Sequence, residues 1–390
     1  MGRADMTFAD LTTLRVGGGI GHFLDVTDTD SLLETLATID DVSTETLFIL
    51  GRGSNIIASD SGWPGTVVRL DGGAINPHVE SDRTVYTVDA GVDWDQFVQR
   101  TIADRTAGIE LLSGIPGRVG AAPIQNIAAY GQQVADVITA VETFDRTHRS
   151  VEWVTKAECA FGFRTSRFKH DWHDRIVTRV RFELPDASQQ PPTPSTYVDV
   201  ERHFATHGGD PTDLAARRAA VLAARGAKSM LDLADDPLTH SVGSFFVNPV
   251  VPVALAHELG ELFQVRHLSV QYLEAEADRR DGMVRVPGAL VLRYAGFHPG
   301  DRWGNVQLSD RHLLAIVARP GATATDVWRV GHHVKTRVAD TVGSDVLQFE
   351  PRFIGIFDDP RLDRFESEYA FTRGDGPEPS WLTGYRTKPT

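Results

Sequence analysis

The chain has 390 residues, more than the roughly 250–300 at which a single hydrophobic core stops growing, so we expect two or three domains. Hydrophobic residues make up 41% of the chain and charged residues 24%, as in ordinary globular proteins. The formal net charge of −14 argues against nucleic acid or an anionic membrane as the main partner. Clustered arginine and lysine can still form a local site for an anionic ligand.

Cysteine content and the N-terminal sequence restrict the compartment and the kind of site. Cys159 is the single cysteine, so intrachain disulfides and Cys-pair metal sites are excluded, and we expect it to be buried in a reducing environment. Residues 1–5 lack the apolar core of a signal peptide, and no apolar run approaches the roughly 20 residues of a membrane helix. We therefore expect a cytoplasmic protein without a membrane partner or a protein-bound metal.

The periodicity of apolar residues predicts helices that alternate with strands. Residues 31–34, Ser-Leu-Leu-Glu, form a capping-box pattern that predicts the start of a short helix. A second helix is expected over 93–107, with Gly108 placed to end it. The other predicted elements are strands at 46–50, 85–90, 138–144, 176–184 and 346–356, a helix at 213–225, and a helix that begins at the cap 323–326 and ends before Gly343.

A glycine- and proline-rich segment at 113–131 is the strongest candidate for a binding loop. It has four glycines and two prolines in nineteen positions, with small residues where a helix or strand would place bulk. Such backbone can approach a ligand closely, and its N–H groups can hold a phosphate or pyrophosphate. The alternative is a structural turn rich in glycine and proline.

A second glycine cluster, Gly-Arg-Gly-Ser-Asn at 51–55, follows the predicted strand at 46–50. The dinucleotide fingerprint fails here because Ile56 occupies the position of its last glycine, and it fails at 17–21 because of His22. No Gly-Lys-Ser/Thr P-loop occurs either. The chain thus has phosphate-compatible loops but none of the common nucleotide motifs.

This combination resembles the UDP-N-acetylenolpyruvoylglucosamine reductases, flavoenzymes of bacterial cell-wall synthesis, from about residue 11 to residue 356. The segments that carry the resemblance, in the family's order, are 12–18, 49–55, 115–131, 161–169, 243–249 and 349–355. The resemblance implies an α+β protein with the three-domain FAD-binding fold of the vanillyl-alcohol-oxidase type and a separate substrate-binding domain. The expected parts are two FAD-binding domains at 1–72 with 345–370 and at 73–233, a substrate-binding domain at 234–344, and a flexible tail at 371–390.

In this family NADPH reduces a non-covalent FAD, and UDP-N-acetylglucosamine enolpyruvate is then reduced to UDP-N-acetylmuramate. The resemblance therefore implies that hydride reaches the methylene carbon and that negative charge develops on the adjacent carbon and its carboxylate. Such chemistry needs a cation at the carboxylate and an acid for the carbanion. Arg164 is the expected carboxylate clamp. Ser244 is the expected acid, and Glu350 is expected to stabilise or protonate the same intermediate, so the source of the final proton stays open between them.

The family's binding positions give the remaining expected contacts. Those to FAD are Gly51, Gly53, Ser54, Asn55, Gly114, Pro116, Gly117, Gly120, Ala121, Ala122, Ile124, Gln125, Asn126 and Gly131. Those to the UDP-sugar are Tyr197, Arg225, Lys228, Asn248 and Arg352. Because the family usually has serine where this chain has Ala121-Ala122, any flavin contact there is expected from backbone N–H groups.

Other readings of the same residues stay open. Ser244 could bond locally, Arg164 could form a surface ion pair, and Glu350 could pair with Arg352. Another FAD-dependent oxidase or dehydrogenase of this fold, acting on an alcohol or sugar acid, would not need all three catalytic residues. A non-catalytic nucleotide-sugar-binding protein would lack the flavin. A serine hydrolase is disfavoured, because Gly-Ser-Phe-Phe at 243–246 is not a nucleophile elbow and no pattern marks a histidine partner.

Overall fold

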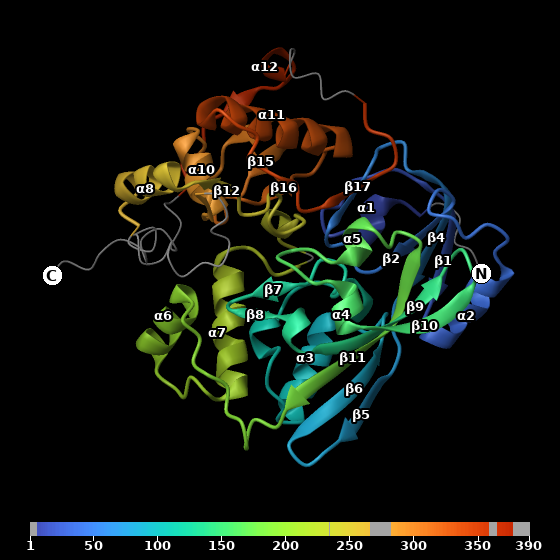
Figure 1. Ribbon diagram of the computed structural model, residues 1–390. Coiled ribbons are helices and arrows are strands. Elements are labelled where there is room, and N and C mark those ends of the chain that lie inside the picture. Colours follow the sequence, from blue (N-terminus) through green and yellow to red (C-terminus); the bar gives the residue numbers. More distant parts are fainter. Residues whose placement is uncertain (1–5, 234, 266–281, 359–364, 377–390) are drawn as a thin grey trace. The chain divides into compact units, whose positions relative to one another are not determined.

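The computed structural model describes residues 6–233, 235–265, 282–358 and 365–376. The backbone forms two compact units, both drawn in Figure 1. Unit 1 contains Met1–Thr7, Gly19–Ser54 and Trp63–Gly226, and unit 2 contains Phe8–Gly18, Asn55–Gly62 and Ala227–Thr390. The finer division into three domains stays a prediction. Of the expected tail at 371–390, residues 377–390 lie outside the described residues.

Unit 1 contains two β-sheets and a short hairpin. The parallel sheet has the order β1-β4-β2, with β1 (Ile20–Val26), β4 (Trp63–Leu70) and β2 (Leu47–Leu50). The antiparallel sheet has the order β10-β9-β11-β6-β5, with β10 (Ser150–Thr155), β9 (Ile138–Asp145), β11 (Arg175–Pro185), β6 (Arg83–Asp89) and β5 (Ile75–Val79). The hairpin pairs β7 (Ala128–Ala129) with β8 (Gln132–Gln133).

The helices of unit 1 are mostly short. They are α2 (Thr29–Thr38), α3 (Trp94–Ala103), α4 (Lys156–Cys159), α5 (Arg167–His170), α6 (Val198–His207) and α7 (Leu214–Ala227), with 3₁₀ turns η1 (Glu110–Leu112), η2 (Val119–Ala121) and η3 (Val134–Asp136). The single cysteine, at the end of α4, is fully buried, as the sequence predicts.

Alternating burial along β6 and β11 explains the larger sheet. The facing pairs Tyr86 with Phe182 and Val88 with Val180 are all fully buried. Apolar side chains therefore occupy every second position on one face. Helix α3 covers that face, because the ring of Phe97 lies 4.8 Å from the ring of Phe182 and 5.5 Å from that of Tyr86. The core of unit 1 thus forms between this sheet and α3.

Unit 2 combines short strands with one long helix. Its antiparallel sheet has the order β16-β15-β14-β18, with β16 (Ile316–Ala318), β15 (Val306–Leu308), β14 (Arg302–Trp303) and β18 (Phe371–Thr372). Two further pairs join β12 (Val250–Pro252) to β13 (Met283–Arg285) and β17 (Arg352–Ile354) to β3 (Ile56–Ala58). The helices are α1 (Phe8–Leu11), η4 (Pro237–Thr239), α8 (Val253–Leu262), α10 (Gly288–Tyr294), α11 (Ala324–Val342) and α12 (Phe365–Glu368).

Helix α11 begins and ends where the sequence predicts. The Thr323 side chain accepts a hydrogen bond from the Asp326 N–H, and the Asp326 side chain accepts one from the Thr323 N–H. Gly343 follows the last turn in the left-handed conformation, with φ +81°, which glycine adopts without strain. The buried face of α11 packs against α10, β15 and β16, and this contact forms much of the core of unit 2.

Three predicted boundaries are wrong. Helix α2 begins at Thr29, because the Asp28 carboxylate accepts hydrogen bonds from both the N–H and the hydroxyl of Ser31, so the 31–34 box does not form the cap. Helix α3 ends at Ala103, because the chain turns away to pair Thr106 with Asp186. The expected strand at 346–356 is limited to β17, at 352–354.

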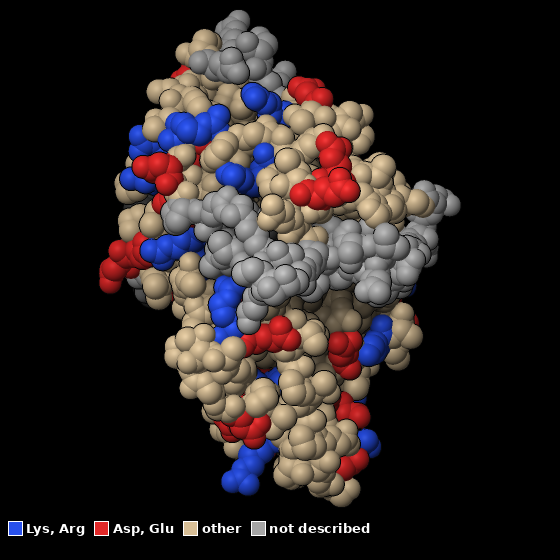
Figure 2. Space-filling model, turned by 90° about the vertical axis from the view of Figure 1, so that its left-hand side faces the viewer, with Lys and Arg blue, Asp and Glu red and all other residues tan. Residues whose placement is uncertain are grey.

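Among the described residues, no helix has both the length and the apolar character needed to cross a membrane. On the face drawn in Figure 2, basic and acidic side chains lie interspersed among uncharged ones.

Candidate active site

The two glycine-rich loops that the sequence predicts as flavin loops lie against each other in unit 1. The Ser54 hydroxyl donates a hydrogen bond of 2.7 Å to the carbonyl oxygen of Pro116. A Cβ atom at Gly51 would lie 3.5 Å from the Cγ of Arg118, which is ordinary van der Waals contact. Both loops therefore belong to one continuous surface.

Most N–H groups in the second half of the longer loop are used within the protein. Those of Gly120, Ala121, Ala122 and Ile124 donate to backbone carbonyl oxygens at distances between 2.8 and 3.3 Å. The structure therefore does not support a backbone N–H contact to flavin at these four positions, because the same donors already bond to carbonyl oxygens of the loop or of Ala90. Their assignment to the flavin site stays a prediction.

Three other N–H groups of the two loops are available to a ligand. Within the described part of the chain, the N–H groups of Gly53, Ser54 and Gly117 have no hydrogen-bond acceptor. A Cβ atom at Gly117 or Gly131 would meet no atom within 4 Å, so the space beside these glycines is open. Unpaired donors beside open space suit an anionic group such as a pyrophosphate.

The loop that carries Arg164 is tied to the longer glycine-rich loop by three hydrogen bonds. The Arg164 Nη1 atom donates to the carbonyl oxygen of Ala128 at 2.8 Å. The Asn126 amide donates to the carbonyl oxygen of Gly162 at 2.9 Å, and the Ser166 hydroxyl donates to that of Ile124 at 2.6 Å. The guanidinium is therefore held beside the predicted flavin loop.

Two tyrosines and a second arginine lie near Arg164. The rings of Tyr130 and Tyr197 meet edge to face, with centroids 5.3 Å apart. Burial raises the pKa of Tyr130 to about 12, and its neighbour Arg225, which hydrogen-bonds to it, acts against that rise. Burial likewise raises the pKa of Tyr197, and the charge of Arg164 opposes the rise. The predicted residues Arg164, Tyr197 and Arg225 are thus brought together with a phenol that the sequence analysis did not select.

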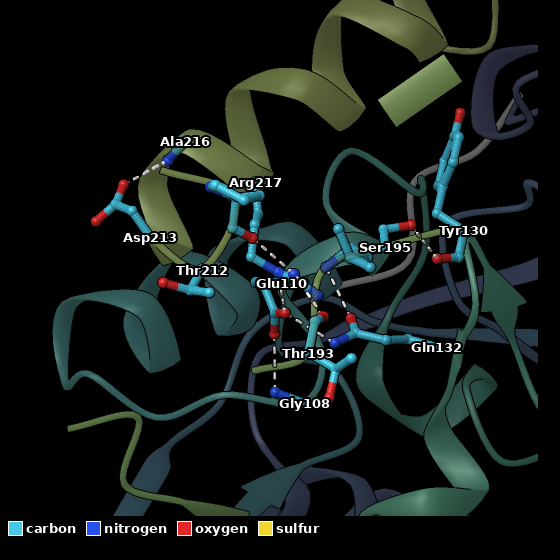
Figure 3. Close-up of polar contacts among 12 residues, drawn as sticks. Gly108, Glu110, Tyr130, Gln132, Thr193, Ser195, Thr212, Asp213, Ala216 and Arg217 are labelled. Atoms are coloured by element: carbon cyan, nitrogen blue, oxygen red, sulfur yellow. Dashed lines mark hydrogen bonds and ion pairs between the residues drawn. The ribbon is translucent and has the colours of Figure 1, made fainter. Parts of the chain in front are cut away.

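Buried polar contacts hold helix α7 and the hairpin that contains Tyr130 (Figure 3). The Nε of Arg217, on α7, donates to Glu110 at 2.7 Å, and the two side chains are 3% and 0% exposed. The Gln132 side chain donates to the same carboxylate at 2.9 Å and accepts from the Leu111 N–H at 2.7 Å. Helix α7 and strand β8, which follows Tyr130 in the hairpin, are therefore attached to the same carboxylate.

In unit 2, Ser244 lies on a segment held by buried neighbours. Phe245 and Phe246, which follow it, are fully buried. A Cβ atom at Gly331 of α11 would lie 2.6 Å from the ring of Phe245, so that glycine makes room for the phenyl group. The half-buried Ser244 hydroxyl lies 3.0 Å from the Nε2 of His312. The structure thus gives this serine a histidine neighbour that no sequence pattern marks.

Glu350 lies on the backbone segment next to that of Ser244. Phe246 and Phe349 form an antiparallel bridge, and the N–H of Glu350 donates to the carbonyl oxygen of Phe245 at 3.0 Å. The two residues predicted to handle the proton are thus placed on paired segments, although they are about a hundred positions apart in the sequence.

Asn55, at the end of the shorter glycine-rich loop, is tied to the Glu350 segment. Its side-chain amide donates to the carbonyl oxygen of Glu350 at 3.3 Å, and its own carbonyl accepts from the N–H of Arg352 at 3.0 Å. Desolvation lowers the pKa of the Arg352 guanidinium. Asn55 therefore supports the Glu350 segment of unit 2 whether or not it touches flavin.

Hydrogen bonds locate two further predicted substrate contacts, Asn248 directly and Lys228 through the next residue in the chain. The Asn248 side chain accepts from the Gly288 N–H at 2.9 Å, and so caps the first turn of α10. Lys228 precedes Ser229, whose hydroxyl accepts from Arg311 at 3.2 Å. Both assignments to the UDP-sugar stay predictions. Sequence reasoning missed Tyr130, whose aromatic ring among small residues was a usable signal, and His312, which no motif marked.

The sequence is similar to proteins of one family over most of its length. Residues 22–152 match the family described as FAD binding domain, and residues 235–354 match that described as UDP-N-acetylenolpyruvoylglucosamine reductase, C-terminal domain. The reductase of that name from Thermobifida fusca is 38% identical over 357 residues, which is 90% of this chain and 98% of the relative. The one from Mycobacterium ulcerans is 37% identical over 361 residues, which is 89% of this chain and 93% of the relative.

A solved structure shares the fold. The crystal structure of UDP-N-acetylenolpyruvylglucosamine reductase from Thermus caldophilus aligns with a TM-score of 0.58 at 24% identity, covering 91% of this chain and all of the other. The α+β FAD-binding fold expected from the sequence is confirmed. Because curated relatives above 35% identity cover nine-tenths of its length, the chain belongs to the UDP-N-acetylenolpyruvoylglucosamine reductase family.

Proposed function

We propose that the chain catalyses the FAD-dependent reduction of UDP-N-acetylglucosamine enolpyruvate to UDP-N-acetylmuramate, with NADPH as electron donor, in the synthesis of the peptidoglycan precursor. Membership of the reductase family carries this proposal. Two separate arrangements support it. In unit 1, Arg164 lies near Tyr197, whose ring packs against that of Tyr130, and in unit 2, Ser244 and Glu350 lie on paired segments.

The residues present fit a dissociable FAD. The free N–H groups of Gly53, Ser54 and Gly117, next to the open space beside Gly117 and Gly131, would hold its pyrophosphate. When bound, FAD takes electrons from NADPH and supplies the hydride. The protein supplies orientation and electrostatics, and those tasks belong to the side chains of the two units.

Arg164 is assigned to the carboxylate of the enolpyruvyl group. Its planar guanidinium can form two parallel hydrogen bonds to a carboxylate, and its anchor on the Ala128 carbonyl limits how far it can move. Arg225 and Tyr197 are assigned to the diphosphate and sugar, together with Lys228, Asn248 and Arg352. Tyr130 holds a hydrogen bond with Arg225 and so keeps that buried cation in place.

Ser244 is assigned as the proton donor, and Glu350 as the group that stabilises the same intermediate. The hydroxyl carries a proton at neutral pH and can give it to the carbanion. Glu350, on the segment paired with that of Ser244, is placed to act on the same intermediate.

The purified protein is expected to be yellow, with one non-covalent FAD per chain. Acid precipitation should release the flavin into the supernatant, where its absorbance gives the stoichiometry. A covalently retained flavin would favour the alternative oxidase of the same fold. Colourless protein that takes up no added FAD would contradict the proposal and favour a binding protein.

A pair of glycine variants tests the loop assignment. Gly120→Ala places a Cβ atom 2.5 Å from that of Ala90, so we expect overpacking to cost about 1–3 kcal/mol in the free energy of unfolding. Gly117→Ala meets no atom within 4 Å, so unfolding of the flavin-free protein should be unchanged while FAD binds more weakly. Chemical denaturation and a flavin titration measure the two effects. Unaltered FAD affinity in Gly117→Ala would move the pyrophosphate away from this loop.

We further infer a cytoplasmic enzyme with a UDP-sugar as its partner and neither nucleic acid nor membrane as a target. The net charge of −14 and the interspersed charges on the face in Figure 2 support this, since neither favours an extended polyanion.

A further inference from the structure

We propose that His312 is a positioning residue that sets Ser244 as a proton donor, and this inference rests on the role proposed above for Ser244. It starts from one contact, in which the Nε2 atom of His312 lies 3.0 Å from the Oγ atom of Ser244. At that distance one of the two atoms donates a hydrogen to the other. Which of them donates decides what the serine can do.

Both partners of this contact are held in place by their own backbone. On the histidine side, the Ser309 hydroxyl accepts from the His312 N–H at 3.2 Å, and the carbonyl oxygen of His312 accepts from the Ala315 N–H at 2.8 Å. On the serine side, the Phe245 N–H donates to the carbonyl oxygen of Leu314 at 2.7 Å. The two segments are thus joined by a backbone hydrogen bond right beside the Ser244–His312 contact.

Buried neighbours prevent either segment from shifting. Leu313, next to His312, and Phe245, next to Ser244, are both fully buried. Farther along the same two segments, Ser241 and Val317 form an antiparallel bridge. The contact therefore lies between two segments that are both anchored in the core of unit 2, and it differs from a chance meeting of two surface side chains.

The direction of the hydrogen bond follows from the chemistry that the serine must perform. If the hydroxyl donated to Nε2, its proton would be directed at the imidazole, which is the arrangement that activates a serine as a nucleophile. If the Nε2–H donates to Oγ, a lone pair of the oxygen is occupied and the single hydroxyl hydrogen is left for the substrate. Protonation of a carbanion requires the second arrangement.

The local fold agrees with a donor rather than a nucleophile. A nucleophile elbow places its serine on a sharp turn between a strand and a helix. After Ser244 the chain instead pairs with the Glu350 segment and runs into strand β12. The histidine thus meets a serine that leads into a β-bridge and a strand, not one at a strand-to-helix turn.

The step balances as follows. Hydride adds to the methylene carbon of the enolpyruvyl group, and the electron pair of the double bond moves to the adjacent carbon. That carbon takes the proton of the Ser244 hydroxyl, and the electrons of the broken O–H bond stay on Oγ as an alkoxide. The Nε2–H of His312 stabilises this alkoxide by a charge-assisted hydrogen bond, and water later returns a proton to Oγ.

Stopped-flow measurement of flavin reoxidation by the enolpyruvyl substrate tests the proposal in two variants. In His312→Ala we expect reoxidation to slow roughly 10- to 100-fold, which corresponds to a lost hydrogen bond to a developing charge. His312→Gln should recover part of the rate, because its amide can donate to Oγ. Reduction by NADPH, flavin content and thermal stability should match those of the wild type and of a His257→Ala control on α8.

A double-variant cycle separates positioning from a structural role. If His312 acts only through Ser244, adding His312→Ala to Ser244→Ala should slow reoxidation no further. Additive losses, or equal slowing of both half-reactions by His312→Ala, would overturn the inference in favour of a structural histidine. Wild-type reoxidation in His312→Ala, with Ser244→Ala slow, would overturn it while leaving the proposed function intact. Wild-type reoxidation in Ser244→Ala would instead refute the role of Ser244 on which it rests.

Discussion

Ser244→Ala is expected to slow reoxidation of the flavin by the enolpyruvyl substrate roughly 10²–10⁴-fold, the usual contribution of a positioned acid. Reduction of the flavin by NADPH should be nearly unchanged, because no proton goes to the substrate carbon in that half-reaction. Phe245 and Phe246 anchor the segment, so the loss of one half-buried hydroxyl should not disturb the fold. Rapid-mixing absorbance traces of the two half-reactions give the two rates separately.

The matched control is Ser61→Ala, in a loop of the same unit. Its hydroxyl lies 2.9 Å from that of Ser59 and has no part in the proposed chemistry, so both half-reactions should keep their rates. Equal slowing of both half-reactions in Ser244→Ala would show that this serine maintains the structure rather than delivering the proton.

Arg217→Ala is expected to destabilise the protein by about 3–5 kcal/mol, because it leaves a buried carboxylate without its cation. Glu110 is fully buried. Its partner Arg217 also donates hydrogen bonds of 2.9 Å to the carbonyl oxygens of Thr193 and Pro211. Removal of the guanidinium therefore leaves two carbonyl acceptors and one charge unsatisfied at once. Chemical denaturation followed by circular dichroism measures the loss.

Arg83→Ala is the control for this prediction, because its ion pair with Glu80 is exposed and its removal should hardly change the midpoint of unfolding. Replacing Glu110 and Arg217 together by Leu and Met should recover part of the lost stability, since neither charge is then left unpaired. A single Arg217→Ala variant as stable as Arg83→Ala would mean that the buried pair contributes little. In that case Arg225 and Tyr130 would be positioned by other contacts.

Elements with a strong local pattern were predictable from the sequence. Helix α11 shows why, because its capping box, its apolar face and its terminal glycine all indicate the same boundaries. Strands β6 and β11 likewise follow from alternation in the sequence. The cap of α2 was missed because Asp28 and Ser31 are both good capping residues. Only the folded structure shows that the Asp28 carboxylate is the cap and accepts hydrogen bonds from Ser31.

The site was predictable where a motif carries the residue and not where tertiary contact creates the role. Arg164, Ser244 and Glu350 stand in family motifs, and the structure places the last two on paired segments. His312 lies 68 positions from Ser244 in the sequence, and no local sequence pattern at either residue predicts their contact. The hydrogen bond of the Gly120 N–H could not be predicted either, because its acceptor, the carbonyl oxygen of Ala90, comes from a different part of the chain.

An anaerobic titration of the purified protein tests the central claim most directly. We expect NADPH to bleach the flavin absorbance, and stoichiometric UDP-N-acetylglucosamine enolpyruvate to restore it without oxygen, with UDP-N-acetylmuramate as the product. A flavin that NADPH bleaches and that only oxygen restores would contradict the account, because electrons would then have no route to the enolpyruvyl group.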